Sequence, residues 1–292
     1  MNPKKFFKPL LLLIAVSVLI LGAPQPLKTN PNPNNDIHVI FDMNGVLVKN
    51  SGETKILGIG KFIAYALMHP FSIKKTIRKK LYEFLNTLEA RDPQETNACD
   101  EEGTQLPQIM CTWMKGTKTP AAILEDVETE VAQRWGGLEL NIVSSISRMM
   151  FTPELMAQTQ EWVPETLDFV DELKEQGYKV HILSNFDTHT FNVMRKQHPE
   201  VFEKFDSITV SGDIGLIKPD PTIYEHVLTT NGIDRSKSFF IDDCLVNVQA
   251  AEQQGICSSL CTKKGKNPHI KAVRDDFYDW IDHMTNHVGA VA

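Results

Sequence analysis

Short apolar runs alternate with amphipathic stretches in the second half of the chain, a pattern typical of strands that alternate with helices. Helices are predicted over 162–176, over 220–231 and over a stretch that ends at Gly255, because apolar residues recur there at helical spacing and Pro or Gly marks the ends. Strands are predicted at 37–41, 179–183, 207–211, 238–241 and 258–262. Short connections between such elements predict a doubly wound α/β fold, with a parallel sheet covered on both faces.

The alternation is interrupted between residues 50 and 159. Helical spacing is found at 73–88, 123–135 and 142–151, and the intervening stretch 91–107 is polar and loop-like. We therefore predict an all-helical insertion after the first strand. Residues 271–292 carry Phe277, Trp280 and Ile281 at helical spacing and are predicted to form a C-terminal helix that packs on the sheet domain.

The N-terminus has the pattern of an export signal. Lys4, Lys5 and Lys8 precede the apolar run Leu10–Leu21, and small residues follow it. Twelve helical residues cover about 18 Å, which is short of the roughly 30 Å hydrocarbon core of a membrane. Residues 1–23 are therefore predicted to be a signal peptide, with an uncleaved membrane anchor as the alternative, and residues 24–36 a linker. The protein would then be periplasmic or secreted, or anchored to the membrane by this segment alone.

Composition narrows the class of protein. The 292 residues include 30 basic and 37 acidic ones, so the formal net charge is −7. An acidic chain argues against binding of nucleic acid through a basic surface. The five cysteines lack the paired spacing of a zinc site and are too scattered for a disulfide scaffold.

Polar residues stand where three of the predicted strands end. Asp42, Ser184 and Asp242 each follow directly after an apolar run, and Asp243 comes next. In an open parallel sheet the ligand binds beyond the carboxyl ends of the strands, so these side chains are expected to share one site. Carboxylate oxygens are the ligands that Mg²⁺ prefers.

Four segments occur in this order along the chain: Val39–Val48 (VIFDMNGVLV), Ile182–Asn185 (ILSN), Gly215–Tyr224 (GLIKPDPTIY) and Phe240–Ala250 (FIDDCLVNVQA). Together these segments resemble the haloacid dehalogenase superfamily, and most closely its bacterial sugar-phosphate phosphatase-like members. The resemblance implies a Rossmann-like core from residues 37–49 and 160–270, with residues 50–159 as a helical cap. It also implies a magnesium-dependent hydrolase that acts on a small phosphomonoester, such as a sugar phosphate, through an aspartyl-phosphate.

The resemblance also assigns roles to residues. Asp42 is the expected nucleophile and a metal ligand, Asp242 and Asp243 complete the magnesium site, and the backbone carbonyl of Asn44 is a further candidate ligand. A second set is expected to bind the phosphoryl group: Ser184, Asn185 and Lys218, of which the lysine also balances the carboxylates.

Asn44 departs from the pattern of the phosphatases in this superfamily. They usually carry an aspartate there, which protonates the leaving alcohol and then activates water. An amide does neither near neutral pH, and loss of a general acid–base typically lowers the rate by ~10²–10⁴-fold. Two alternatives therefore stay open: a catalytically weak protein that binds a phosphorylated ligand or a protein partner, and a haloacid dehalogenase. The adjacent Asp242 and Asp243 argue against the dehalogenase, which needs no metal.

Overall fold

The computed structural model describes residues 36–50, 73–93, 98–100, 102–134, 136–265 and 267–288. The predicted signal peptide or anchor, and the linker up to residue 35, lie outside the described residues. Within the described part of the chain, no helix combines the length and the apolar character needed to span a membrane.

A parallel five-stranded sheet forms the centre of the fold, as predicted. Its strands are β1 (His38–Phe41), β4 (Lys179–Ser184), β5 (Ser207–Val210), β6 (Ser238–Asp242) and β7 (Cys257–Leu260), in the order β5-β4-β1-β6-β7. β1 is thus the central strand, and β4 and β6 flank it. Their carboxyl ends bring Asp42, Ser184 and Asp242 to the same edge of the sheet.

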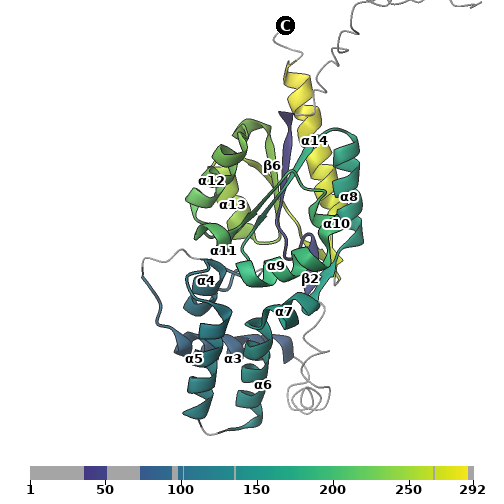
Figure 1. Ribbon diagram of the computed structural model, residues 1–292. Coiled ribbons are helices and arrows are strands. Elements are labelled where there is room, and N and C mark those ends of the chain that lie inside the picture. Colours follow the sequence, from purple (N-terminus) through teal and green to yellow (C-terminus); the bar gives the residue numbers. More distant parts are fainter. Residues whose placement is uncertain are drawn as a thin grey trace, which may run out of the picture. The chain divides into compact units, whose positions relative to one another are not determined.

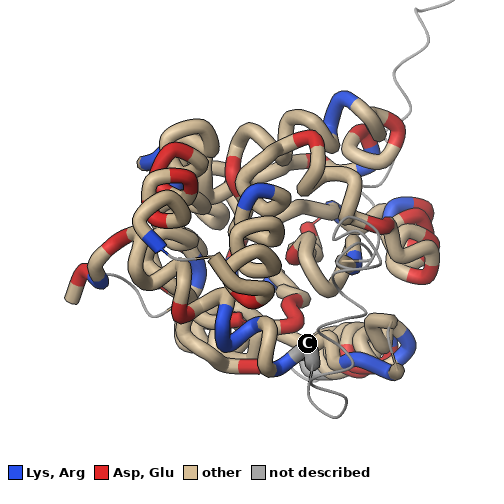
Figure 2. Tube along the Cα trace, turned by 90° about the horizontal axis from the view of Figure 1, so that it is seen from below, with Lys and Arg blue, Asp and Glu red and all other residues tan. Residues whose placement is uncertain are grey.

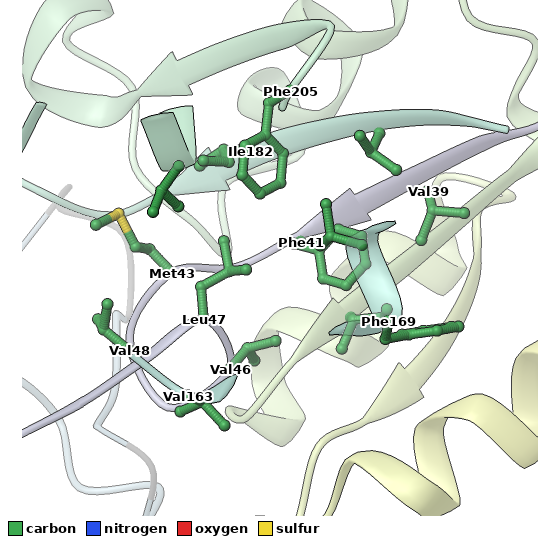
Figure 3. Close-up of a cluster of buried hydrophobic side chains, with 14 of the residues drawn as sticks. Val39, Phe41, Met43, Val46, Leu47, Val48, Val163, Phe169, Ile182 and Phe205 are labelled. Carbon is green, nitrogen blue, oxygen red and sulfur yellow. The ribbon is translucent and has the colours of Figure 1, made fainter. Parts of the chain in front are cut away.

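Helices cover both faces of this sheet (Figure 1). α8 (Pro164–Glu175) and α14 (Ile270–Val288) lie on one face, and α12 (Pro221–Asn231) and α13 (Leu245–Gln253) lie on the other. Side chains alternate along β1 accordingly. Val39 and Phe41 are buried with Phe169 of α8 (Figure 3), whereas Ile40 is buried with Tyr224 of α12. The apolar run of this strand is continuous because both of its faces are buried.

Three helices follow β4 and β5: α9 (Thr188–Gln197), α10 (Pro199–Phe202) and α11 (Ser211–Ile214). The apolar pattern did not predict α9, because only a few of its residues face the interior, among them Phe191 and Met194. Asp187 caps this helix by accepting a hydrogen bond from the Thr190 N–H at 2.9 Å. A 3₁₀ turn, η2 (Arg235–Lys237), precedes β6, and the short strands β8 (Lys263–Lys264) and β9 (Asn267–Pro268) pair after β7.

The region between β1 and β4 is helical, as predicted. It contains α3 (Ile73–Leu88), α4 (Gln108–Met114), α5 (Pro120–Ala132), α6 (Leu138–Met150) and α7 (Pro153–Thr159), which share a buried apolar cluster. The bounds of α3 match the prediction, while α4 and α7 have seven residues each and were not predicted. The strands β2 (Val48–Asn50) and β3 (Gln160–Trp162) pair antiparallel where the chain leaves and re-enters the sheet domain.

Acidic and basic positions are interspersed along the helices in Figure 2. Many of them pair on the surface, as Arg148 does with Glu128 at 2.5 Å and Lys271 with Asp275 at 2.6 Å. Exposed pairs of this kind contribute little to stability, about 0–1 kcal/mol each.

Candidate functional site

A tight turn after β1 carries the first carboxylate of the site. The N–H groups of Leu47 and Val48 both donate to the carbonyl of Met43, at 2.9 and 2.8 Å. Gly45 has φ +81° in this turn, and a Cβ at this position would lie 1.9 Å from Oδ2 of Asp243. Only glycine therefore combines this backbone conformation with the close approach of the Asp243 carboxylate.

Lys218 lies at the centre of the site, and only 1% of its side chain is exposed. Its ammonium group donates to Oδ1 of Asp42 and to Oδ2 of Asp242, each at 2.6 Å, and to the carbonyl of Leu183 at 3.1 Å. A buried ammonium is tolerated only when it is paired and hydrogen-bonded, and here all three partners come from the ends of strands. The structure therefore joins three residues that lie far apart in the sequence.

Asn185 holds this lysine through a pair of hydrogen bonds. Its side-chain amide donates to the Lys218 carbonyl at 2.9 Å, and its Oδ1 accepts from the Lys218 N–H at 2.8 Å. The sequence suggested that the backbone of Asn185 contacts the phosphoryl group. The structure adds a different use for the side chain, which fixes the turn that presents Lys218.

Asp242 is held by groups that sequence reasoning missed. Its Oδ1 accepts from the N–H of Cys244 at 2.8 Å, and the amide of Asn247 lies 3.1 and 3.2 Å from its two oxygens. Asn247 stands in the first turn of α13, five residues after Asp242. A buried asparagine in the first turn of a helix that follows an acidic pair is a weak signal, but the sequence did contain it.

Burial and charge shift the pKa values of the buried cluster. Desolvation, reinforced by Asp242, outweighs the attraction of Lys218 and raises the pKa of Asp42 to about 7. Burial alone would lower the pKa of Lys218, but the carboxylates of Asp242 and Asp42 outweigh it and raise that pKa above its usual value. The cluster therefore favours a charged lysine, whereas burial disfavours the ionised form of Asp42.

Two further predicted residues differ in their environment. Ser184 is fully buried at the end of β4, and its hydroxyl oxygen has no hydrogen-bond partner. Ser184 follows Leu183, whose carbonyl accepts from Lys218, and an unpartnered hydroxyl at this point is suited to bind an oxygen of a ligand. Asn44, in contrast, is exposed, and its backbone forms an isolated bridge with Val48.

The arrangement fits a divalent cation of the hard, oxygen-preferring class. Asp42, Asp242 and Asp243 each offer a carboxylate oxygen, and these atoms lie within 4.8 Å of one another. The glycine at position 45 leaves the space that the third carboxylate occupies. Mg²⁺ is commonly bound by one or two carboxylates together with water and substrate phosphate, so this donor set suits it.

Contacts from the helical region lie beside the site. Ser211, which follows β5, donates its hydroxyl proton to the Met114 carbonyl of α4 at 2.6 Å. Ile217, the neighbour of Lys218, is fully buried in the apolar cluster of the helical region. The helical insertion therefore packs directly against the loop that carries the lysine.

Comparisons with known proteins identify the family of this chain. The family model described as haloacid dehalogenase-like hydrolase matches residues 38–255. A sesquiterpene phosphatase from Aspergillus oryzae is 39% identical over 85 residues, which are 29% of this chain and 43% of that protein. A phosphatase from Mycobacterium tuberculosis is 23% identical over 154 residues, 53% of this chain and 70% of that protein. The chain spans less than half the length of the Aspergillus protein.

A solved structure shares the fold. It is the HAD family enzyme of Bacteroides thetaiotaomicron in complex with magnesium and inorganic phosphate. It is 21% identical, covers 79% of this chain and 96% of its own, and superposes with a TM-score of 0.52. The match to the family model extends over more than half of the chain and includes the strand ends that carry the carboxylates. The chain belongs to the haloacid dehalogenase-like hydrolases.

Proposed function

We propose that this protein is a magnesium-dependent phosphomonoester hydrolase that uses Asp42 as its nucleophile. The observation that carries the proposal is the buried ammonium of Lys218, 2.6 Å from both Asp42 and Asp242, with Asp243 close enough to share a cation. A carboxylate attacks an anionic phosphate only where nearby positive charge offsets the repulsion. This cluster provides a lysine and a place for a cation at the same point.

The residues of the cluster then have distinct roles in the reaction. An oxygen of Asp42 attacks phosphorus and forms a P–O bond as the bond to the leaving alcohol breaks, and water later hydrolyses the resulting aspartyl-phosphate. Lys218 orients Asp42 through Oδ1 and attracts the phosphoryl oxygens, while the hydroxyl of Ser184 donates to one of them. When bound by Asp42, Asp242 and Asp243, Mg²⁺ would neutralise charge on the phosphoryl group.

Asn44 determines which substrates this site handles best. Its amide cannot protonate the departing oxygen, so a leaving group that is stable as an anion gains an advantage. We infer that aryl phosphates react much faster than alkyl phosphates, and that sugar phosphates are the physiological class only if another group supplies the proton. The superfamily resemblance supports a small phosphorylated metabolite as substrate.

The test is phosphate release from a panel of aryl and alkyl phosphomonoesters, with and without Mg²⁺. The wild-type chain is compared with Asp42→Asn, which removes the nucleophile, and with Asn44→Asp, which restores the proton donor. We expect Asp42→Asn to be inactive and Asn44→Asp to gain ~10²-fold or more on alkyl phosphates but little on aryl phosphates. Activity that survives in Asp42→Asn would refute the proposal.

Asn44 also favours a second candidate function, binding without efficient turnover. A wild-type chain that hydrolyses no member of the panel, but whose Tm rises with Mg²⁺ and inorganic phosphate, would support it. The N-terminal pattern supports a further proposal, that the chain is exported. N-terminal sequencing of the mature protein after cell fractionation would test it, because a cleaved signal peptide predicts a start after residue 23 and an anchor predicts an intact N-terminus.

A further inference from the structure

Asp100 connects the segment 98–104 to the helix α3 through its carboxylate. Its Oδ1 accepts from the N–H groups of Glu102 and Thr104 at 3.0 and 2.9 Å. Its Oδ2 accepts from the hydroxyl of Tyr82 at 3.0 Å, and the guanidinium of Arg78 lies 3.5 Å from the same oxygen. Arg78 also pairs with Glu102. One carboxylate thus shapes the backbone around it and ties that backbone to α3.

The same backbone lies against the residue that follows the acidic pair. The sulfur of Cys244 is 3.7 Å from the carbonyl oxygen of Asp100 and 3.9 Å from that of Cys99. Cys244 is 5% exposed, and its N–H donates to Oδ1 of Asp242 at 2.8 Å. The helical region therefore reaches the loop of Asp242 and Asp243 at Cys244.

Side chains of α3 help to hold this backbone in place, together with its own hydrogen bonds, such as that from the Leu106 N–H to the Ala98 carbonyl at 2.9 Å. A thiol is a weak hydrogen-bond donor, so the contacts of Cys244 with two carbonyls add little to stability. Asp100 accepts a hydrogen bond from the Tyr82 hydroxyl and forms an ion pair with Arg78, and hydrogen bonds to a charged group are roughly twice as strong as neutral ones. Since the contacts of Asp100 with α3 are stronger than those of the two carbonyls with the thiol, they hold these carbonyls against Cys244.

We propose that Asp100 is a positioning residue that seats the cap backbone on Cys244 and so shields the loop of Asp242 and Asp243 from water. This inference rests on the proposed function for its kinetic consequence. Charge interactions strengthen where water is excluded, so the shielded loop binds a phosphoryl group more tightly than an exposed one. Loss of the contact between the cap backbone and Cys244 therefore weakens substrate binding, while the groups that carry out the chemistry stay in place.

The test uses two substitutions, at Asp100 and Tyr82, and one control in the same helical region. Asp100→Asn weakens the contacts with Arg78 and Tyr82 while it keeps a side-chain acceptor, and Tyr82→Phe deletes a single hydroxyl. The control, Glu128→Gln, breaks the exposed pair of Glu128 with Arg148. Carbamidomethylation of Cys244 by iodoacetamide is followed by mass spectrometry, with the half-buried Cys257 of β7 as internal reference.

We expect Cys244 to be labelled about tenfold faster, relative to Cys257, in Asp100→Asn and less strongly so in Tyr82→Phe, and at the wild-type rate in Glu128→Gln. In phosphate release, KM should rise about tenfold while kcat changes by less than about twofold, because the lost interaction acts on binding. A variant that folds poorly would instead contain less active enzyme, which lowers the apparent kcat. A lowered Tm identifies such a variant.

If Cys244 is labelled at the wild-type rate in both Asp100→Asn and Tyr82→Phe, the proposal is overturned, regardless of the values of KM and kcat. Faster labelling with an unchanged KM would overturn the link to substrate binding. The labelling needs no turnover, so it still supports or refutes the seating of the cap if the wild-type chain hydrolyses none of the phosphomonoesters. Failure of the proposed function and failure of this inference are therefore distinguishable.

Discussion

Acid should weaken one contribution to the stability of this protein, that of the buried imidazole of His181 in β4. His181 is 3% exposed and is the third residue of β4, three positions before Ser184. Its Nε2 is 2.9 Å from Nδ1 of His38, and its Nδ1 is 2.7 Å from the hydroxyl of Ser207. A neutral ring can satisfy both contacts, whereas a charged ring would place an imidazolium in a desolvated position.

The magnitude follows from the pKa of His181. Desolvation, reinforced by His38 and by Lys179, outweighs the attraction of Asp206 and lowers this pKa from 6.5 to about 4. The folded-state pKa lies below the unfolded one, so the unfolded chain binds a proton first as the pH falls. The stabilisation is present above pH 6.5 and is lost as the pH drops towards 4. Between about pH 7.5 and about pH 5 the loss amounts to about 2 kcal/mol.

The assay is urea unfolding across this pH range for the wild type and for His181→Gln, which cannot titrate. The variant is expected to have a lower free energy of unfolding at neutral pH because it loses packing. The comparison therefore uses the slope of the free energy of unfolding against pH, not its absolute value. His283→Gln, on the exposed side of α14, is the matched control and should keep the wild-type slope. Equal slopes for the wild type and His181→Gln would refute the reasoning.

Two further predictions concern the carboxylate cluster. Lys218→Met leaves Asp42 and Asp242 facing each other without a cation, and urea unfolding in metal-free buffer should show a loss of about 3–5 kcal/mol; an unchanged stability would contradict the role given to the ammonium. Gly45→Ala places a methyl group on the carboxylate of Asp243. Calorimetry should show that Mg²⁺ no longer raises the Tm of this variant, and a wild-type rise would contradict the metal site.

The positions of β1, β4 and β6 could be predicted from the sequence because each is a short apolar run that ends at a polar residue. The run IHVIF predicted β1 to within one residue, and KVHIL and SFFI predicted β4 and β6 equally well. Asp42, Ser184 and Asp242 were expected to meet because the carboxyl ends of parallel strands lie together, and the sheet order places them on adjacent strands. Periodicity and topology were sufficient for this part of the site.

The remaining features depend on contacts that leave no periodic signal. The short helices α4 and α7 owe their existence to burial in the helical cluster, since seven residues make only two turns. The approach of Asp243 to Gly45 joins residues about 200 positions apart, and nothing local marks it. Asn247 is ordinary helix sequence until the fold brings its amide to Asp242. Such side-chain geometry is set by tertiary packing alone.

Charge balance connects the buried lysine, the metal and the substrate. When ionised, the three carboxylates and one ammonium of the cluster leave two negative charges beside a phosphate dianion. Burial is the main cause of the raised pKa of Asp42, and Lys218 alone offsets neither this burial nor the charge excess. A divalent cation held by the same carboxylates would remove it and keep Asp42 ionised as a nucleophile. The cluster is therefore built for a state that includes a cation, and Lys218 supplies only part of the positive charge that the chemistry requires.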